Sequence, residues 1–188
     1  MLILVRHGRT AANASGLLQG RLDLPLDEVG LEQARQVAAA VGNVDLVISS
    51  PLVRARQTAD AFGIDVSIDE RWLELDYGEY DGRKLADIPA DTWTRWTTDP
   101  TFSTPAGESM GSLDARVRRA AADAIELARD QDVVIVSHVS PIKAAVAWAL
   151  GGDIAMSFRC HLDQAAVCRI GAGGNGPVLR TFNEVLYR

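Results

Sequence analysis

The chain has 188 residues, of which 47% are hydrophobic and 23% charged, and its formal net charge at pH 7 is -6. This length and composition predict one domain, residues 1–188, with a buried core. The negative balance argues against a nucleic-acid-binding protein, which needs a basic face for phosphate contacts. It leaves room for a small anionic ligand held by a few converging arginines.

The sequence shows no pattern of a targeting or membrane-spanning segment. The first apolar run, residues 2–5, is too short for a signal-peptide core, and no later run approaches the ~20 apolar residues of a membrane helix. Cys160 and Cys168 lack metal-site spacing, so we expect ordinary thiols in a reducing compartment. We therefore expect a cytoplasmic protein with no membrane partner.

The first half of the chain alternates predicted strands with predicted helices. Apolar residues at helical spacing predict a helix that Asp27 caps and Gly42 ends. Ser50 and Pro51 predict the cap and first turn of another helix. In chain order, the predicted elements are strand 2–5, helix 27–42, strand 46–48, helix 50–62 and strand 66–68.

The second half begins with an irregular stretch, residues 71–105, in which we expect one or two short helices. Beyond it, Ser109 begins a long amphipathic helix, and Ser140 with Pro141 opens a further one. The alternation predicts an α/β fold, a three-layer sandwich with a mostly parallel sheet, helices on both faces and a C-terminal antiparallel strand. The remaining predicted elements are helix 109–130, strand 133–136, helix 140–150, and strands 165–170 and 178–182 joined by a glycine-rich turn.

Several reactive side chains directly follow predicted strands. His7 follows the first strand, Arg54 lies just past the second, and His138 follows strand 133–136. Ligands of open α/β sheets bind beyond the carboxyl ends of the strands. Two of these ends also open helices, whose N-termini favour anions, and Arg6 offers a planar fork for phosphate oxygens. The sequence therefore predicts a phosphate pocket at this edge.

The reactive residues lie in short motifs that follow one another along nearly the whole chain. The motifs are Arg6–Thr10 with Asn13, Ser49–Leu52 with Arg54-Ala55 and Gln57–Ala59, Glu74–Gly78 with Gly82, Pro105–Ser109, and Ser137-His138. In content and order, this set resembles the histidine phosphatase superfamily, which includes cofactor-dependent phosphoglycerate mutases and many small phosphatases.

The resemblance implies a role for each matching residue. His7 would be the nucleophile and Glu74 the proton donor, whereas Arg6, Arg54 and His138 would hold the phosphate. For substrate binding we add four further positions to this clamp, namely Asn13, Gln19, Gly20 and Val139.

Three positions near the predicted pocket have features of their own. Gly8 lets the backbone approach a ligand closely. Val139 replaces the glycine that usually follows the second histidine of the family, so we expect a changed substrate mouth. Arg9 replaces a more familiar glutamate or glutamine, which would add positive charge near the entrance.

These residue types can transfer a phosphoryl group without a metal or other cofactor, because positioning and positive charge dominate that reaction. A neutral His7 would attack, with charge supplied by the two arginines and a protonated His138. Glu74 would be protonated, through burial or a nearby phosphate, and would later take a proton from water. No His, Cys, Asp and Glu cluster has the spacing of a metal site.

Two other motifs have simpler explanations. Gly107–Gly111 matches the serine-hydrolase elbow but lacks the preceding buried strand, so Ser109 is better explained as a helix cap than as the nucleophile of an esterase. Gly171–Gly176 matches the dinucleotide-binding pattern, but a strand rather than a helix follows it. We interpret it as a hairpin turn.

The predicted partner is a small-molecule phosphate ester, and the alternatives to a phosphatase are a phosphoglycerate mutase and a catalytically silent binding or regulatory module. Mutases of the family carry a sizeable insertion between the acid and the second histidine, whereas residues 74–138 form a short segment here. Sugar phosphates, phosphoglycerate derivatives and nucleoside-type phosphates all stay open as substrates, and a homodimer stays open as the assembly. The aromatic residues Trp72, Tyr80, Trp93 and Trp96 fit either the substrate mouth or core packing.

Overall fold

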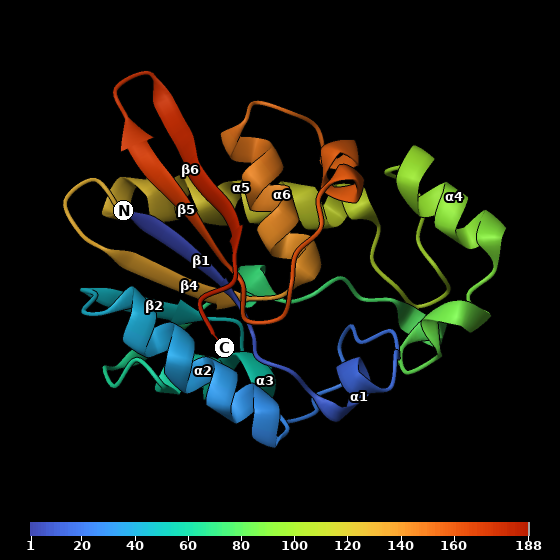
Figure 1. The fold of residues 1–188 in the computed structure, drawn as a ribbon. Helices are drawn as coiled ribbons and strands as arrows, with labels where there is room; N and C mark the ends of the chain where they lie inside the picture. The colour runs from blue at the N-terminus through green and yellow to red at the C-terminus, as the bar shows by residue number, and fades with distance from the viewer. Residues whose placement is uncertain (188) are drawn as a thin grey trace.

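The computed structural model describes residues 1–187 and contains a six-stranded sheet in the order β3-β2-β4-β1-β5-β6 (Figure 1). β1, β2, β3 and β4 run parallel, whereas β5 is antiparallel to both of its neighbours, β1 and β6. The mostly parallel sheet and the antiparallel C-terminal strand are thus confirmed. The strands are β1 Leu2–Arg6, β2 Leu46–Ser49, β3 Val66–Ile68, β4 Val133–Ser137, β5 Val167–Gly173 and β6 Gly176–Glu184.

The helices connect the strands in nearly the predicted order. Asp27 caps α2 by accepting a hydrogen bond from the Gly30 N–H at 2.8 Å, and Ser109 caps α5 in the same way. The α-helices are α1 Ala11–Ala14, α2 Glu28–Val41, α3 Val53–Asp60, α4 Ala90–Thr98, α5 Met110–Leu127 and α6 Val139–Ala149. Four short 3-10 segments are η1 Glu70–Trp72, η2 Gly78–Tyr80, η3 Leu85–Asp87 and η4 Ile154–Arg159.

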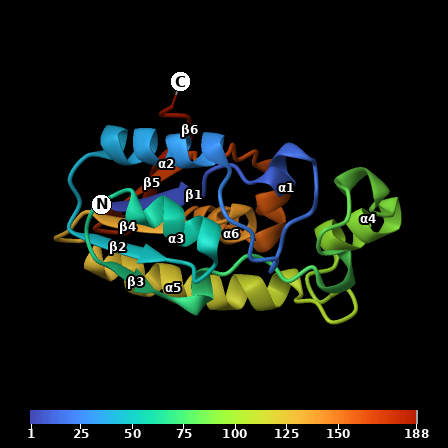
Figure 2. The same ribbon diagram turned by 90° about the horizontal axis from the view of Figure 1, so that it is seen from below.

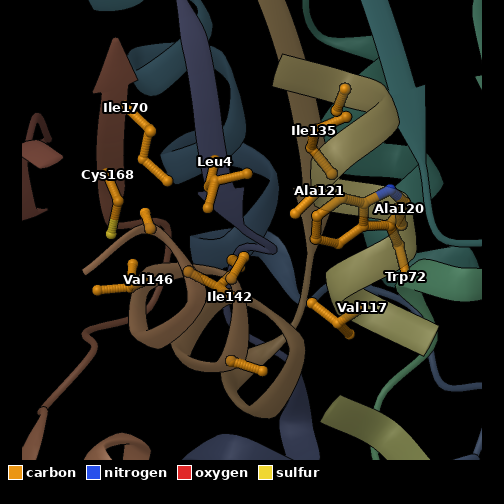
Figure 3. Packing of buried hydrophobic residues seen from close by; sticks show 14 of the residues in the cluster. Leu4, Trp72, Val117, Ala120, Ala121, Ile135, Ile142, Val146, Cys168 and Ile170 are labelled. Carbon is orange, nitrogen blue, oxygen red and sulfur yellow. The ribbon is translucent and has the colours of Figure 1, made fainter. Parts of the chain in front are cut away.

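Helices cover both faces of the sheet, which confirms the three predicted layers. Successive residues of a strand point to opposite faces. Accordingly, Leu4 and Ile135 pack against α5 and α6 (Figure 3), whereas Val5 and Val136 share a second cluster with residues of α2 and α3. Because β1 and β4 are buried on both faces, their sequences are nearly continuous apolar runs.

One segment stands apart from the layers. Residues 78–105, which we call the α4 lobe, contain η2, η3 and α4 and project from one end of the body (Figures 1 and 2). The lobe has a small cluster of its own, built on Ile88 and Trp96 with Leu18 from the N-terminal segment. The irregular character predicted for this stretch is confirmed, including one α-helix and short helical turns.

Two predicted helix starts are wrong. α3 begins at Val53 rather than at Ser50, and Asp23 of a distant loop accepts the Val53 N–H at 2.6 Å. α6 begins at Val139, so the Ser140 N–H already lies inside its first turn. Long-range partners satisfy the free N–H groups at these starts, and local capping patterns cannot predict such partners.

The glycine-rich stretch near the C-terminus confirms the predicted hairpin. β5 and β6 continue further than predicted and leave residues 174–175 as the turn. No helix within residues 1–187 is long and apolar enough to span a membrane.

Candidate active site

The carboxyl ends of β1, β2 and β4 meet at one edge of the sheet, as the sequence predicted. Arg6 pairs with Ser137 in the β1–β4 ladder, so the two following histidines leave the sheet side by side. The His7 N–H donates to the Ser137 carbonyl at 3.0 Å, and the ring centroids of His7 and His138 lie 5.1 Å apart.

The hydrogen bonds of His7 determine which of its ring nitrogens is free. Nδ1 lies 2.7 Å from the Gly8 carbonyl oxygen, which can only accept, so Nδ1 carries the proton. Nε2 accepts from the Arg54 Nε–H at 3.2 Å and therefore has the lone pair. Burial, reinforced by Arg54 and Arg6, holds the pKa of His7 well below its ordinary value, which keeps the ring neutral.

Gly8 is required for a different reason from the one predicted. Its N–H donates to the Thr58 hydroxyl at 3.1 Å, and a Cβ at this position would collide with the carbonyl oxygen of Gly30 in α2. The small residue therefore allows the segment after β1 to pack against α2, and its backbone does not line the cavity.

Arg54 lies in the first turn of α3 and is fully buried beside His7. Its guanidinium donates to the carbonyl oxygens of Gly20 and Leu22, both at 2.7 Å, in addition to His7. Burial lowers the pKa of Arg54 to about 10, so the group stays cationic at neutral pH. Gly20, which the sequence predicted as a substrate contact, thus helps to hold Arg54 in place through its carbonyl oxygen.

His138 is also fully buried, and its Nε2 lies 2.8 Å from the Ser50 hydroxyl. Within residues 1–187, its Nδ1 has no hydrogen-bond partner. Burial, together with Arg54 and His7, holds the pKa of His138 well below its ordinary value. The positive charge predicted for this ring therefore depends on a bound anion that offsets these effects.

Glu74 is brought to the same edge by the loop that follows η1. Only 4% of its surface is exposed, and its Oε1 accepts from the backbone N–H groups of Leu75 at 2.7 Å and Ser140 at 3.2 Å. The second bond ties the carboxyl to the first turn of α6, directly after His138.

Arg116 of α5 anchors this loop and was missed in the sequence. Its guanidinium donates to the carbonyl oxygens of Arg71 and Leu73, both at 2.7 Å, and of Glu74 at 3.2 Å. Glu108 neutralises it through an ion pair of 2.7 Å. Glu108 lies in the Pro105–Ser109 motif, but nothing in the local sequence distinguishes Arg116 from other helix arginines.

A cavity of about 310 Å³ opens beside His7 and Glu74. Of the predicted substrate contacts, Arg6, Asn13, Gln19 and Val139 line the cavity, whereas Gly20, Arg54 and His138 do not. The other lining residues are Leu17, Leu18, Leu75, Tyr77, Leu85, Trp93, Trp96, Met110, Ser140, Lys143, Ser157 and Phe158.

The aromatic residues divide between the two roles left open by the sequence. Trp93 and Trp96 line the cavity, and Trp96 is also buried in the cluster of the α4 lobe. Trp72 is 1% exposed in the main core, and Tyr80 packs against the cluster of the α4 lobe. Arg9 adds no charge to the cavity, because its side chain turns to Asp27 at 2.8 Å.

The arrangement suits an anion that reacts with a nucleophile. A neutral imidazole, whose Nε2 lone pair accepts from Arg54, lies beside the charged groups of Arg6 and Arg54, and the buried carboxyl group of Glu74 lines the same cavity. Among residues 1–187, no group of three or more His, Cys, Asp and Glu side chains is placed to hold a metal ion.

Known proteins are similar to this chain in sequence over most of its length. A protein of Hydrogenobacter thermophilus named "Putative phosphoserine phosphatase 2" is 32% identical over 196 residues, which cover 99% of this chain and 96% of that protein. An Enterobacter protein named "Probable phosphoglycerate mutase GpmB" is 36% identical over 177 residues, 89% of this chain and 82% of that protein. The chain spans 48% of the length of three mycobacterial relatives that are 35% identical.

Solved structures agree with the sequence relatives. A mutant phosphoserine phosphatase from Entamoeba histolytica, in complex with phosphoserine, matches with a TM-score of 0.89 and 28% identity over 98% of this chain and 96% of that one. A family model described as the histidine phosphatase superfamily (branch 1) matches residues 2–185. The chain therefore belongs to the histidine phosphatase superfamily, whose members among its relatives are phosphatases and mutases.

Proposed function

We propose that the chain hydrolyses a small-molecule phosphomonoester, without a metal, through a phosphohistidine on Nε2 of His7. The observation that carries the proposal is the pair of hydrogen bonds on His7. The Gly8 carbonyl holds the proton on Nδ1, which leaves the Nε2 lone pair directed at Arg54 within the cation-rich pocket. A phosphoryl group that enters would replace His7 as the partner of the Arg54 Nε–H.

In the first step, the Nε2 lone pair forms a bond to phosphorus while the bond from phosphorus to the ester oxygen breaks. Arg6 and Arg54 offset the charge on the phosphoryl oxygens, and the dianion favours protonation of His138. Glu74 gives its proton to the leaving oxygen, because an alkoxide leaves poorly without one.

In the second step, water attacks phosphorus and the bond to Nε2 breaks. Glu74, now ionised, takes a proton from the water, and inorganic phosphate leaves. The carboxyl group is held by two N–H groups in the free protein, at Leu75 and Ser140, so it keeps one position through both steps.

A phosphoglycerate mutase is the second candidate, favoured by the name of the Enterobacter relative. A mutase would return the phosphoryl group to the glycerate rather than to water. With 3-phosphoglycerate, we expect phosphate release to outpace formation of 2-phosphoglycerate, and no bisphosphate activator to be needed. Isomerisation faster than hydrolysis would establish the mutase instead.

The proposal is tested by trapping the intermediate. Rapid quench of the wild type with a ³²P-labelled ester, in buffer containing EDTA, should place acid-labile label on His7. His7→Ala should remove both label and turnover while leaving the circular dichroism spectrum unchanged, because the substitution removes the nucleophile and no core side chain.

His161→Ala is the matched control, since His161 is exposed and pairs only with Asp163 among residues 1–187. We expect it to keep labelling and turnover. Label on a serine, turnover in His7→Ala, or loss of turnover in EDTA that a divalent ion restores would contradict the proposed reaction.

A further inference from the structure

Lys143 is a cation in the cavity that the proposed reaction does not use. It lies on α6 and lines the cavity together with Arg6 and Glu74. Its side chain is half-buried, and within residues 1–187 no hydrogen bond or ion pair joins its ammonium group to a partner. Burial lowers the pKa of Lys143, which means that its position disfavours the charge it carries.

The other charges of the cavity have partners or roles. Arg6 donates to the Leu162 carbonyl at 2.7 Å and faces the phosphoryl group in the proposed reaction. Glu74 accepts from two backbone N–H groups, and it favours the charge of Lys143 from a distance without forming an ion pair with it. With the phosphoryl group matched to Arg6 and Arg54, Lys143 is the cavity cation left without an ion-pair partner among residues 1–187.

The helix places Lys143 away from the transferred group. Val139 and Lys143 are four residues apart, so they share one face of α6 and are separated by about 6 Å along its axis. Val139 adjoins His138 at the reacting end, so Lys143 lies one turn further along the helix from His138. An ester bound at His7 would present its leaving group, rather than its phosphorus, to this position.

We propose that Lys143 is a specificity-determining residue that binds an anionic group carried by the leaving alcohol of the substrate. The inference rests on the proposed hydrolysis and adds its substrate class, a phosphomonoester with a second negative charge. Trp93 and Phe158, which also line the cavity, provide an apolar wall for the carbon skeleton between the two charges.

Matched esters isolate the second charge. The phosphate monoesters of 3-hydroxypropanoate and 3-hydroxypropanamide have the same skeleton and size, and differ in whether the far end is a carboxylate or a neutral amide. The homologues with two and four carbons vary the distance between the phosphate and the group at the far end. We expect the wild type to prefer the carboxylate ester of the best length by about tenfold or more in kcat/KM, the size of a charge-assisted hydrogen bond.

Lys143→Met keeps the length of the side chain and removes its charge, so the preference should fall to near unity, mainly through KM. Lys143→Arg should restore part of it. The sequence has one other lysine, Lys84, which does not line the cavity. Lys84→Met should therefore keep the full preference. A preference that survives in Lys143→Met, or is absent from the wild type at every length, would overturn the assignment.

Binding separates this inference from the proposed hydrolysis. Calorimetry with the His7→Ala variant measures the dissociation constants of both esters without turnover. We expect tighter binding of the carboxylate ester by about tenfold, and loss of that difference in the His7→Ala, Lys143→Met double variant. The proposed hydrolysis stands or falls on the phosphohistidine trapped on His7, whereas the ratio of the two dissociation constants decides the role of Lys143 by itself.

Discussion

The sheet edge and the α4 lobe both contribute residues to the same cavity, and they hold those residues by different means. At the edge, each reactive side chain is fixed by hydrogen bonds of its own, as Arg54 is by two carbonyl oxygens and Glu74 by two N–H groups. In the lobe, Trp93 and Trp96 contact each other edge to face, with ring centroids 5.1 Å apart, in a cluster separate from the main core.

The difference indicates a division of labour. Fixed donors and acceptors suit a reaction that depends on positioning. A small apolar cluster suits the recognition of a leaving group, since its residues can be exchanged without disturbing the sheet. Segments with few buried contacts also open more readily than the core around them. We therefore expect chemistry to depend on the edge, and substrate range and local stability to depend on the lobe.

The largest effect is expected at the edge, in Glu74→Gln. General acid catalysis contributes about 10²–10⁴-fold, or about 3–5 kcal/mol of barrier. The amide keeps the shape of the side chain but has no proton to give, so most of this factor should vanish for alkyl phosphates. p-Nitrophenolate leaves readily without a proton. The rate at which p-nitrophenyl phosphate phosphorylates His7 should therefore fall far less in Glu74→Gln.

The measurement is pre-steady-state, because slow breakdown of phospho-His7 would mask the first step in turnover. The rate at which each substrate phosphorylates His7 should be compared in the wild type and in Glu74→Gln. An equal loss of rate for the two substrates would mean that Glu74 positions the phosphate. The assignment of Glu74 as the acid would then be wrong.

Substitution of two tryptophans tests whether the α4 lobe and the main core differ in stability. Trp72 is 1% exposed in the main core and Trp96 is 3% exposed in the lobe cluster. Replacement of a buried tryptophan by alanine costs about 3–5 kcal/mol. Trp72→Ala should lower the global free energy of unfolding by this amount. Trp96→Ala should mainly release the lobe and leave the sheet folded.

Hydrogen exchange distinguishes local from global loss. In Trp96→Ala, amides of residues 78–105 should exchange faster while those of β1 and β4 keep most of their protection. In Trp72→Ala, protection should fall throughout residues 1–187. Equal loss of protection in both regions of Trp96→Ala would show that lobe and body unfold as one unit.

The sequence predicted the body better than the lobe, for a physical reason. Buried strands and amphipathic helices repeat an apolar pattern over many residues, so β4 and α5 were predicted closely. The lobe has short 3-10 turns whose apolar residues pack among themselves, and such contacts have no period. The starts of α3 and α6 were misplaced because Asp23 and Glu74 reach their N–H groups from elsewhere in the chain.

The residues of the candidate site also fall into those that the sequence could predict and those that it could not. His7, Arg54 and His138 were predictable, because each lies in a short motif at the end of a strand. Arg116 and Lys143 were not, because their importance comes from carbonyl oxygens and a cavity that the fold assembles. Gly8 shows a third case, in which the residue was singled out correctly and the reason lay in packing against Gly30.

The smallest expected effect is on the pH dependence of folding stability, because the sheet edge buries two histidines. The pKa of His7 and of His138 is lowered well below the ordinary value by burial and by nearby Arg54, so the unfolded chain binds more protons than the folded one as pH falls below about 6.5. The two histidines therefore lower the stability as pH falls through that window, and their contribution is complete well above it. Between pH 7 and 5.5, the loss should be about 1.2 kcal/mol for each histidine, or about 2.5 kcal/mol for both.

Denaturant titrations in phosphate-free buffer measure this loss, and the window ends at pH 5.5 because carboxyl groups with lowered pKa values, such as Asp69 and Asp163, begin to contribute below it. His138→Asn should halve the pH-dependent part, since one of the two groups is gone. Inorganic phosphate should reduce it as well, because a bound dianion favours the protonated ring of His138 in the folded state. A free energy of unfolding that rises as pH falls would mean that the folded protein does not keep these histidines neutral. A pH dependence that phosphate leaves unchanged would mean that a bound anion does not favour the protonated ring of His138.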